Sequence, residues 1–122
     1  MVGTISGCGG ATARNGEAAA LAEEFERALH GGDTTAACTL LAPETHSELE
    51  ESQRMKCSAA LAREQLPEGG PVQHVDVYGR QALVVLRGDT LFLSRFGDGW
   101  RVVAAGCEAE PGKPYQCTIK GA

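Results

Sequence analysis

Apolar residues of high β-propensity recur in three short runs in the second half of the chain, over residues 82–86, 91–93 and 100–103. Gly and Asp separate these runs at residues 88–89 and 97–99. Both residue types tolerate the positive φ that tight hairpin turns require. The pattern therefore predicts three strands joined by two tight turns, and we expect the rest of the chain to pack on them.

The first half of the chain has a helical period instead. Over residues 16–30, apolar side chains recur every three or four positions and charged side chains lie elsewhere around the helix. We expect this amphipathic helix to end at the glycine pair 31–32. Its apolar positions are Ala18, Leu21, Ala22, Phe25, Ala28 and Leu29.

Two more helices are predicted after the glycine pair. Asp33 is well placed to cap a short helix over residues 34–42. Pro43 fits the first turn of the next helix, which is polar through its middle and becomes apolar again at residues 57–61. We expect a kink or an interruption of that helix near residues 51–54.

A segment rich in Pro and Gly, residues 67–71, ends the helical half and leads into a strand over residues 72–78. Residues 108–122 are expected to form a tail. Helices followed by an antiparallel meander predict an α+β fold, in which N-terminal helices pack on one face of a curved antiparallel sheet.

The length and charge of the chain limit its partners. The 122 residues are enough for one domain, which we place at residues 16–122, after a flexible Gly- and Ala-rich tether over residues 1–15. A formal net charge of −5 argues against nucleic acid or an anionic membrane surface as a partner. No run of apolar residues is long enough to cross a membrane.

The start of the chain resembles a bacterial lipobox. Small residues precede Cys8, as they do at cysteines that become acylated after signal cleavage. The residues before Cys8 contain neither a basic nor a long apolar segment. Either a leader lies upstream of the sequence, or the resemblance arises by chance and Cys8 is an incidental thiol.

The remaining four cysteines predict a disulfide framework, because their spacing matches no metal site and free thiols at this density are unusual in a small domain. Four cysteines permit three pairings. Proximity in sequence favours Cys38 with Cys57 and Cys107 with Cys117. The alternative is four buried free thiols. Bridged cysteines would place the protein outside the cytoplasm.

Candidate chemistry is sparse. In the strand over residues 72–78, a period of two places His74, Asp76 and Tyr78 on one face. These side chains could form an acid–base site in a cavity, or they could simply be the solvent-facing side of the strand. The sequence has no nucleophile elbow, phosphate-binding glycine loop or zinc-binding helix, so we expect no cofactor and no metal.

The run Phe96-Gly97-Asp98-Gly99-Trp100-Arg101-Val102, after helices and a meander, resembles the last hairpin of the nuclear-transport-factor-2-like superfamily. More narrowly, residues 38–43, 104–107 and 114–117 are similar to small secreted or lipid-anchored actinobacterial proteins. The resemblance implies a cone in which a bent sheet wraps around helices and leaves a pocket. Some members of the superfamily are isomerases or dehydratases, and many have no catalysis.

Three functional hypotheses follow. The first is a non-enzymatic domain, located in the cell envelope or secreted, that binds a small ligand or an envelope protein. Its only contact with the membrane would be through a lipid anchor. The second is a small isomerase- or cyclase-type enzyme that acts on an apolar carbonyl substrate in the cone, with His74, Asp76 and Tyr78 as its acid–base group. The third is a structural module that forms a homodimer through its sheet.

Overall fold

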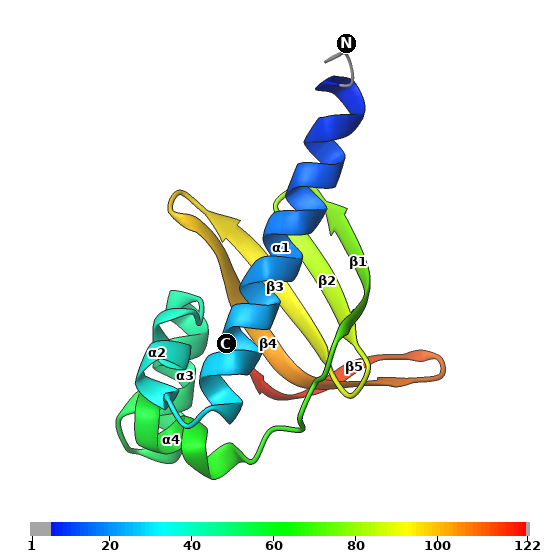
Figure 1. Ribbon diagram of the computed structural model, residues 1–122. Coiled ribbons are helices and arrows are strands. Elements are labelled where there is room, and N and C mark those ends of the chain that lie inside the picture. The colour runs from blue at the N-terminus through cyan, green and yellow to red at the C-terminus, as the bar shows by residue number, and fades with distance from the viewer. Residues whose placement is uncertain (1–5, 122) are drawn as a thin grey trace.

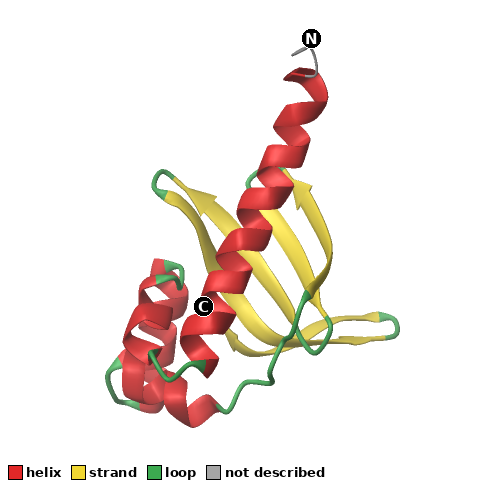
Figure 2. Ribbon diagram, in the orientation of Figure 1, coloured by secondary structure: helices red, strands yellow, loops and turns green. Residues whose placement is uncertain are grey.

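The computed structural model describes residues 6–121, and side chains from residue 12 onward. Four helices come first, and a five-stranded antiparallel sheet follows them, so the fold class is α+β. The helices are α1 (Ser6–His30), α2 (Thr34–Thr39), α3 (Pro43–Gln53) and α4 (Cys57–Glu64). As Figures 1 and 2 show, α1 runs diagonally across one face of the sheet, and the three short helices gather beside its C-terminal end.

The sheet is a meander in which each strand pairs with the next one in sequence. Its strands are β1 (Val72–Tyr78), β2 (Gln81–Leu86), β3 (Thr90–Phe96), β4 (Gly99–Glu110) and β5 (Lys113–Lys120). Bulges interrupt the pairing of β3 with β4 and of β4 with β5. Bulges bend a strand and increase its twist, and β4 is bent in Figure 1, so the β4–β5 hairpin projects away from the rest of the sheet.

The core lies between α1 and the inner face of the sheet. Ala18, Ala22 and Phe25 on α1 are buried, as the helical period predicts. They face every second residue of β2 and β3, where the alternation of buried and half-buried positions follows the period of two. The buried apolar strand residues are Ala82, Val84, Leu86, Leu91, Leu93, Trp100, Val102, Ala104, Ala105, Cys107 and Ile119.

The caps and breaks between the helices follow the local chemistry. The Asp33 side chain accepts a hydrogen bond from the N–H of Ala36 and so caps α2. Pro43 is in the first turn of α3, where its missing N–H costs nothing. Arg54, in the left-handed conformation with φ of 55°, ends α3 before α4 begins. The predicted interruption of the third helix is thus confirmed.

Two expectations from the sequence are wrong at the ends of the chain. The tether expected over residues 1–15 is helical from Ser6 onward, because a helix already nucleated by its packed part extends at low cost. Residues 12–17 are all exposed, and Oε1 of Glu17 lies 3.8 Å from Nη1 of Arg95 in an ion pair that links this part of α1 to β3. The tail expected after Cys107 is instead the end of β4 and the whole of β5.

The sequence of β5 does not predict a strand, for a clear reason. Residues 113–116 are all exposed, and Ile119 is its one buried apolar residue, so no alternation of apolar and polar residues marks the strand. Backbone pairing with β4 holds it in place, together with the bond between the directly opposed residues Cys107 and Cys117.

Candidate functional site

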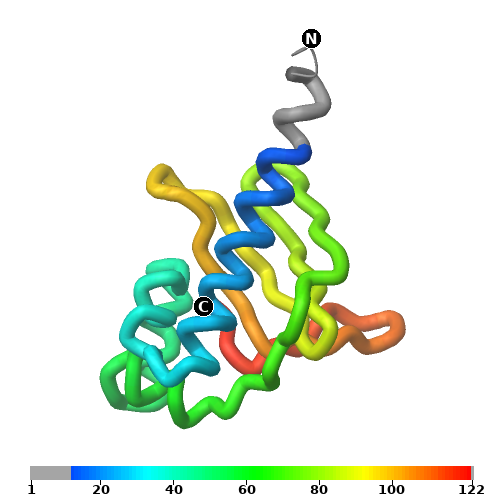
Figure 3. Tube along the Cα trace, viewed as in Figure 1, coloured from blue at the N-terminus to red at the C-terminus, as the bar shows by residue number. Residues whose placement is uncertain are grey.

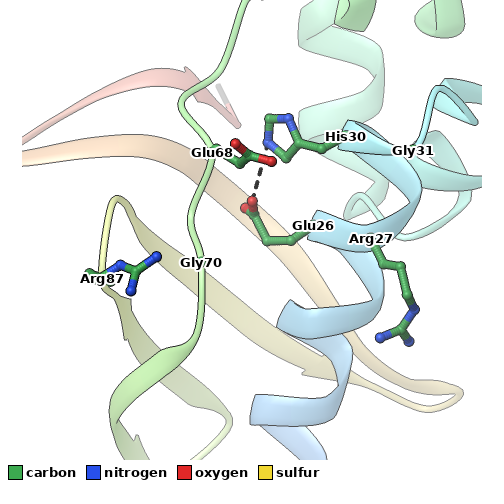
Figure 4. Close-up of a pocket in the computed structure, with 7 residues that line it drawn as sticks. All are labelled: Glu26, Arg27, His30, Gly31, Glu68, Gly70 and Arg87. Carbon is green, nitrogen blue, oxygen red and sulfur yellow. Dashed lines mark ion pairs between the residues drawn. The ribbon is translucent and has the colours of Figure 1, made fainter.

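A polar pocket of about 470 Å³ opens beside the C-terminal end of α1. The segment 65–71 crosses from α4 to β1, as Figure 3 shows. It forms one wall of this pocket, and the turn between β2 and β3, which carries Arg87, closes another side (Figure 4). The volume is within the range of small-molecule sites, roughly 300–1,000 Å³. We call it the α1 pocket. It is lined by Glu26, Arg27, His30, Gly31, Glu68, Gly70 and Arg87.

Glu26 is the buried charge of the α1 pocket and is only 9% exposed. The N–H of Gly69 donates to its Oε1 at 3.1 Å, and the Nε2 of His30 lies 3.3 Å from the same oxygen. Its Oε2 is buried and has no hydrogen-bond partner among the residues described. Burial raises the pKa of Glu26, while the Gly69 hydrogen bond and His30 act in the opposite direction.

Gly69 is a glycine because the chain passes very close to other groups at this point. A Cβ there would collide with Cδ1 of Leu86 and would lie 2.9 Å from Oε1 of Glu26. Without a side chain, the backbone N–H can reach the carboxylate. The sequence marks residues 67–71 only as a helix terminator, and the structure adds that this segment supplies a donor to a buried acid.

His30 is oriented by two acceptors. Its Nε2 lies 3.1 Å from the carbonyl oxygen of Pro67 and 3.3 Å from Oε1 of Glu26. Because a carbonyl oxygen accepts and does not donate, Nε2 carries the hydrogen. His30 therefore ties the last turn of α1 to the 65–71 segment, and the proton on Nε2 is already used in holding the fold together.

Asp89 is the second buried acid near the pocket, and it is 8% exposed. Its carboxylate accepts hydrogen bonds from the N–H of Gly106 at 3.1 Å and of Cys107 at 3.2 Å. Burial raises its pKa, and the backbone hydrogen bonds, including one from Thr90, oppose that rise. Asp89 thus anchors β4 where Gly106 has a φ of 67°, a role beyond the turn residue that the sequence predicts.

The sequence candidates on β1 lie elsewhere. The side chains of His74 and Asp76 are 61% and 62% exposed, with His74 Nε2 3.7 Å from Asp76 Oδ2, and Tyr78 is 55% exposed. Val75 and Val77, on the opposite face of the strand, pack against the core. The trio is therefore a solvent-facing surface and not an acid–base group in a cavity, which corrects the catalytic interpretation.

The sequence gives little sign of the α1 pocket. Glu26 and His30 fit the polar side of an amphipathic helix, and Gly88-Asp89 is explained by its turn. The one available signal is the spacing of Glu26 and His30, which places them four residues apart and so on the same face of the helix.

The structure contains two disulfides. Cys38–Cys57 joins α2 to α4, and Cys107–Cys117 joins β4 to β5. These are the pairs that proximity in sequence favours. Two disulfides in a chain of this size are typical of an oxidising environment outside the cytoplasm. The side chain of Cys8 lies outside the described residues.

The part of the chain that the structure describes contains no helix long and apolar enough to cross a membrane. Over the same residues, no group of three or more His, Cys, Asp or Glu side chains is arranged to hold a metal ion. Comparisons of the chain with protein-family models, with curated proteins and with solved structures find no match.

Proposed function

We propose that this protein is an extracytoplasmic domain that binds a small polar ligand in the α1 pocket and does not transform it. The two disulfides support the compartment, since they persist where the surroundings are oxidising. Secretion or anchoring at the cell envelope, with acylation of Cys8, is part of the proposal. So is membership of the nuclear-transport-factor-2-like superfamily, supported by the order of helices and meander and by the hairpin that contains Trp100.

The observation that carries the proposal is the environment of Glu26. A buried carboxylate oxygen without a partner destabilises a fold, and a domain selected for stability alone would favour an apolar residue there. Here the oxygen belongs to a residue that lines an open pocket. Buried ionisable groups beside a cavity are typical of sites that bind or react.

Binding fits this site better than catalysis. His30 Nε2 is engaged by Pro67 and Glu26, and Glu26 Oε1 by Gly69, so these atoms hold the segment 65–71 against α1. A general acid or base has to release or take up its proton during the reaction. If His30 or Glu26 gave up or took up a proton at these atoms, the contacts that hold the segment 65–71 against α1 would be weakened.

A chemical-shift titration tests the proposal. ¹⁵N-labelled protein is titrated with a panel of small cationic, anionic and zwitterionic compounds, and we expect the amides of His30, Gly69 and Gly70 to shift. The variant Glu26→Gln should weaken the response. Glu23→Gln, a change at an exposed position of the same helix, is the matched control. If every responding amide lies on β1 around His74 and Asp76, or if no compound of the panel binds, the proposal fails.

The outer face of the sheet supports a second candidate function, formation of a homodimer. Half-buried apolar side chains lie on this face across β2, β3 and β4. The ring centroids of Phe92 and Tyr115 lie 5.1 Å apart in an edge-to-face arrangement. Phe96 and Val103 also line a groove of about 380 Å³. Apolar surface of this kind often marks an interface.

Sedimentation velocity over a range of protein concentrations tests the second candidate. A dimer that forms through the outer face should be lost in Phe92→Asp and kept in Arg63→Asp, an exposed position on α4. A wild-type protein that stays monomeric at the highest concentration would exclude this function.

A further inference from the structure

The charges around the α1 pocket are not evenly arranged. Oε2 of Glu26 is an acceptor without a partner among the described residues, and the exposed acid Glu68 lines the same pocket. The pocket also adjoins the C-terminal end of α1, where unsatisfied carbonyl groups give a helix a partial negative charge. These three features favour a positively charged group at the same place.

The two arginines that line the pocket do not neutralise this charge. Figure 4 shows the side chain of Arg27 directed away from the Glu26–His30 pair. The guanidinium of Arg87 lies against Gly70, where its Nη2 is 3.4 Å from the position of an added Cβ. Neither arginine forms an ion pair within the part of the chain that the structure describes.

We propose, building on the pocket's role as a binding site, that its ligand is a small molecule with a primary ammonium group, which donates a hydrogen bond to Oε2 of Glu26. Charge-assisted hydrogen bonds between an ammonium and a carboxylate are among the strong ones. The ligand supplies the donor that the fold does not provide. It also offsets the cost of a buried negative charge, which a neutral donor would do less well.

Entry of the ammonium requires a movement of the side chains that cover Oε2. Oε2 is covered in the structure, and Glu68 is an exposed side chain of the pocket wall that can change rotamer on a picosecond to nanosecond timescale. The backbone of the wall stays in place, because the N–H of Gly69 remains bound to Oε1. A trimethylated ammonium has no N–H to donate and is bulkier, so it should bind less well.

Binding should depend on pH in a defined direction. Burial raises the pKa of Glu26, so its carboxylate is protonated more readily than an exposed one. A bound ammonium favours the ionised form, so affinity should rise with pH as Glu26 ionises. The other groups that face Glu26 or line the pocket are His30, Glu68, Asp89, Arg27 and Arg87.

The test compares small probes that share a short alkyl chain and differ in their charged group, by chemical-shift titration of the wild-type protein at low salt. n-Propylammonium should shift the amides of His30, Gly69 and Gly70, while propionate and trimethylpropylammonium should shift them at least about ten times more weakly at equal concentration. Glu26→Gln should reduce the response to n-propylammonium by a similar factor, and Glu23→Gln should leave it unchanged.

The outcomes separate this inference from the proposed function. If propionate or another compound without an ammonium binds in the α1 pocket and n-propylammonium does not, the ammonium inference is overturned and the binding function stands. If no compound of the whole panel binds there, both are overturned. The comparison of probes and its pH dependence are measured on the wild-type protein. They can therefore refute the inference even if Glu26→Gln misfolds.

Discussion

Removal of the Cys38–Cys57 bond should cost the domain a large part of its stability. The bond closes a loop with a sequence separation of 19. The chain-entropy relation for a loop of this length gives about 3 kcal/mol at 25 °C. Against a typical unfolding free energy of about 5–15 kcal/mol, the double variant Cys38→Ala/Cys57→Ala should raise the unfolded-to-folded ratio on the order of 100-fold.

The single tryptophan provides the assay. Trp100 is buried in the core, so its fluorescence reports global unfolding in urea. The double variant should unfold at a lower midpoint. The matched control is Cys107→Ala/Cys117→Ala, which opens a loop with a sequence separation of 10. Residues 108–116 within that loop are all exposed, so we expect a local loosening of the β4–β5 hairpin and a smaller shift of the midpoint.

Two results would refute this reasoning. If Cys38→Ala/Cys57→Ala unfolds at the same urea concentration as the wild type, the bond does not hold α2 to α4 in solution. If the hairpin variant loses more stability than the helix variant, the loop length does not set the size of the effect. Intact mass with and without reductant confirms beforehand that the wild type contains both bonds.

Three further predictions concern the buried acids and α1. Burial raises the pKa of Glu26 in the folded state, so the stability that this residue contributes is fully present below its pKa in the unfolded chain, about 4.3, and is lost as pH rises through the folded pKa. Urea unfolding at several pH values should therefore show the stability of Glu26→Gln relative to wild type increasing with pH. A difference that stays constant with pH would contradict this. Asp89→Ala should lose about 2–5 kcal/mol in thermal unfolding, since it leaves the N–H groups of Gly106 and Cys107 without their acceptor; Asp89→Asn, which keeps one acceptor, should lose less, and equal losses would argue against hydrogen bonding as the cause. In hydrogen exchange, amides of residues 12–17 should exchange faster than those of residues 22–30, because the side chains of residues 12–17 are all exposed and bury no apolar surface. Equal protection would mean that the exposed ion pair between Glu17 and Arg95 is enough to hold this part of the helix.

Local sequence patterns were sufficient to predict most of the helices and strands. The period of two and the Gly-Asp turns predicted β2, β3 and the start of β4, because alternation and turn chemistry are properties of adjacent residues. The helical period of residues 16–30, the Asp33 cap and Pro43 predicted the helices in the same way. The two disulfides follow from proximity in sequence, which is also a local property.

The strand β5 and the α1 pocket depend on the tertiary structure alone. Exposed residues of β5 are held by β4, which no pattern within β5 shows. The pocket arises because Glu26 meets Gly69, 43 residues later in the chain. A polar residue on a helix has the same local pattern whether it faces water or a buried donor. Glu26 is a buried acid and not a surface charge because α1 packs against the segment 65–71 and against the turn between β2 and β3.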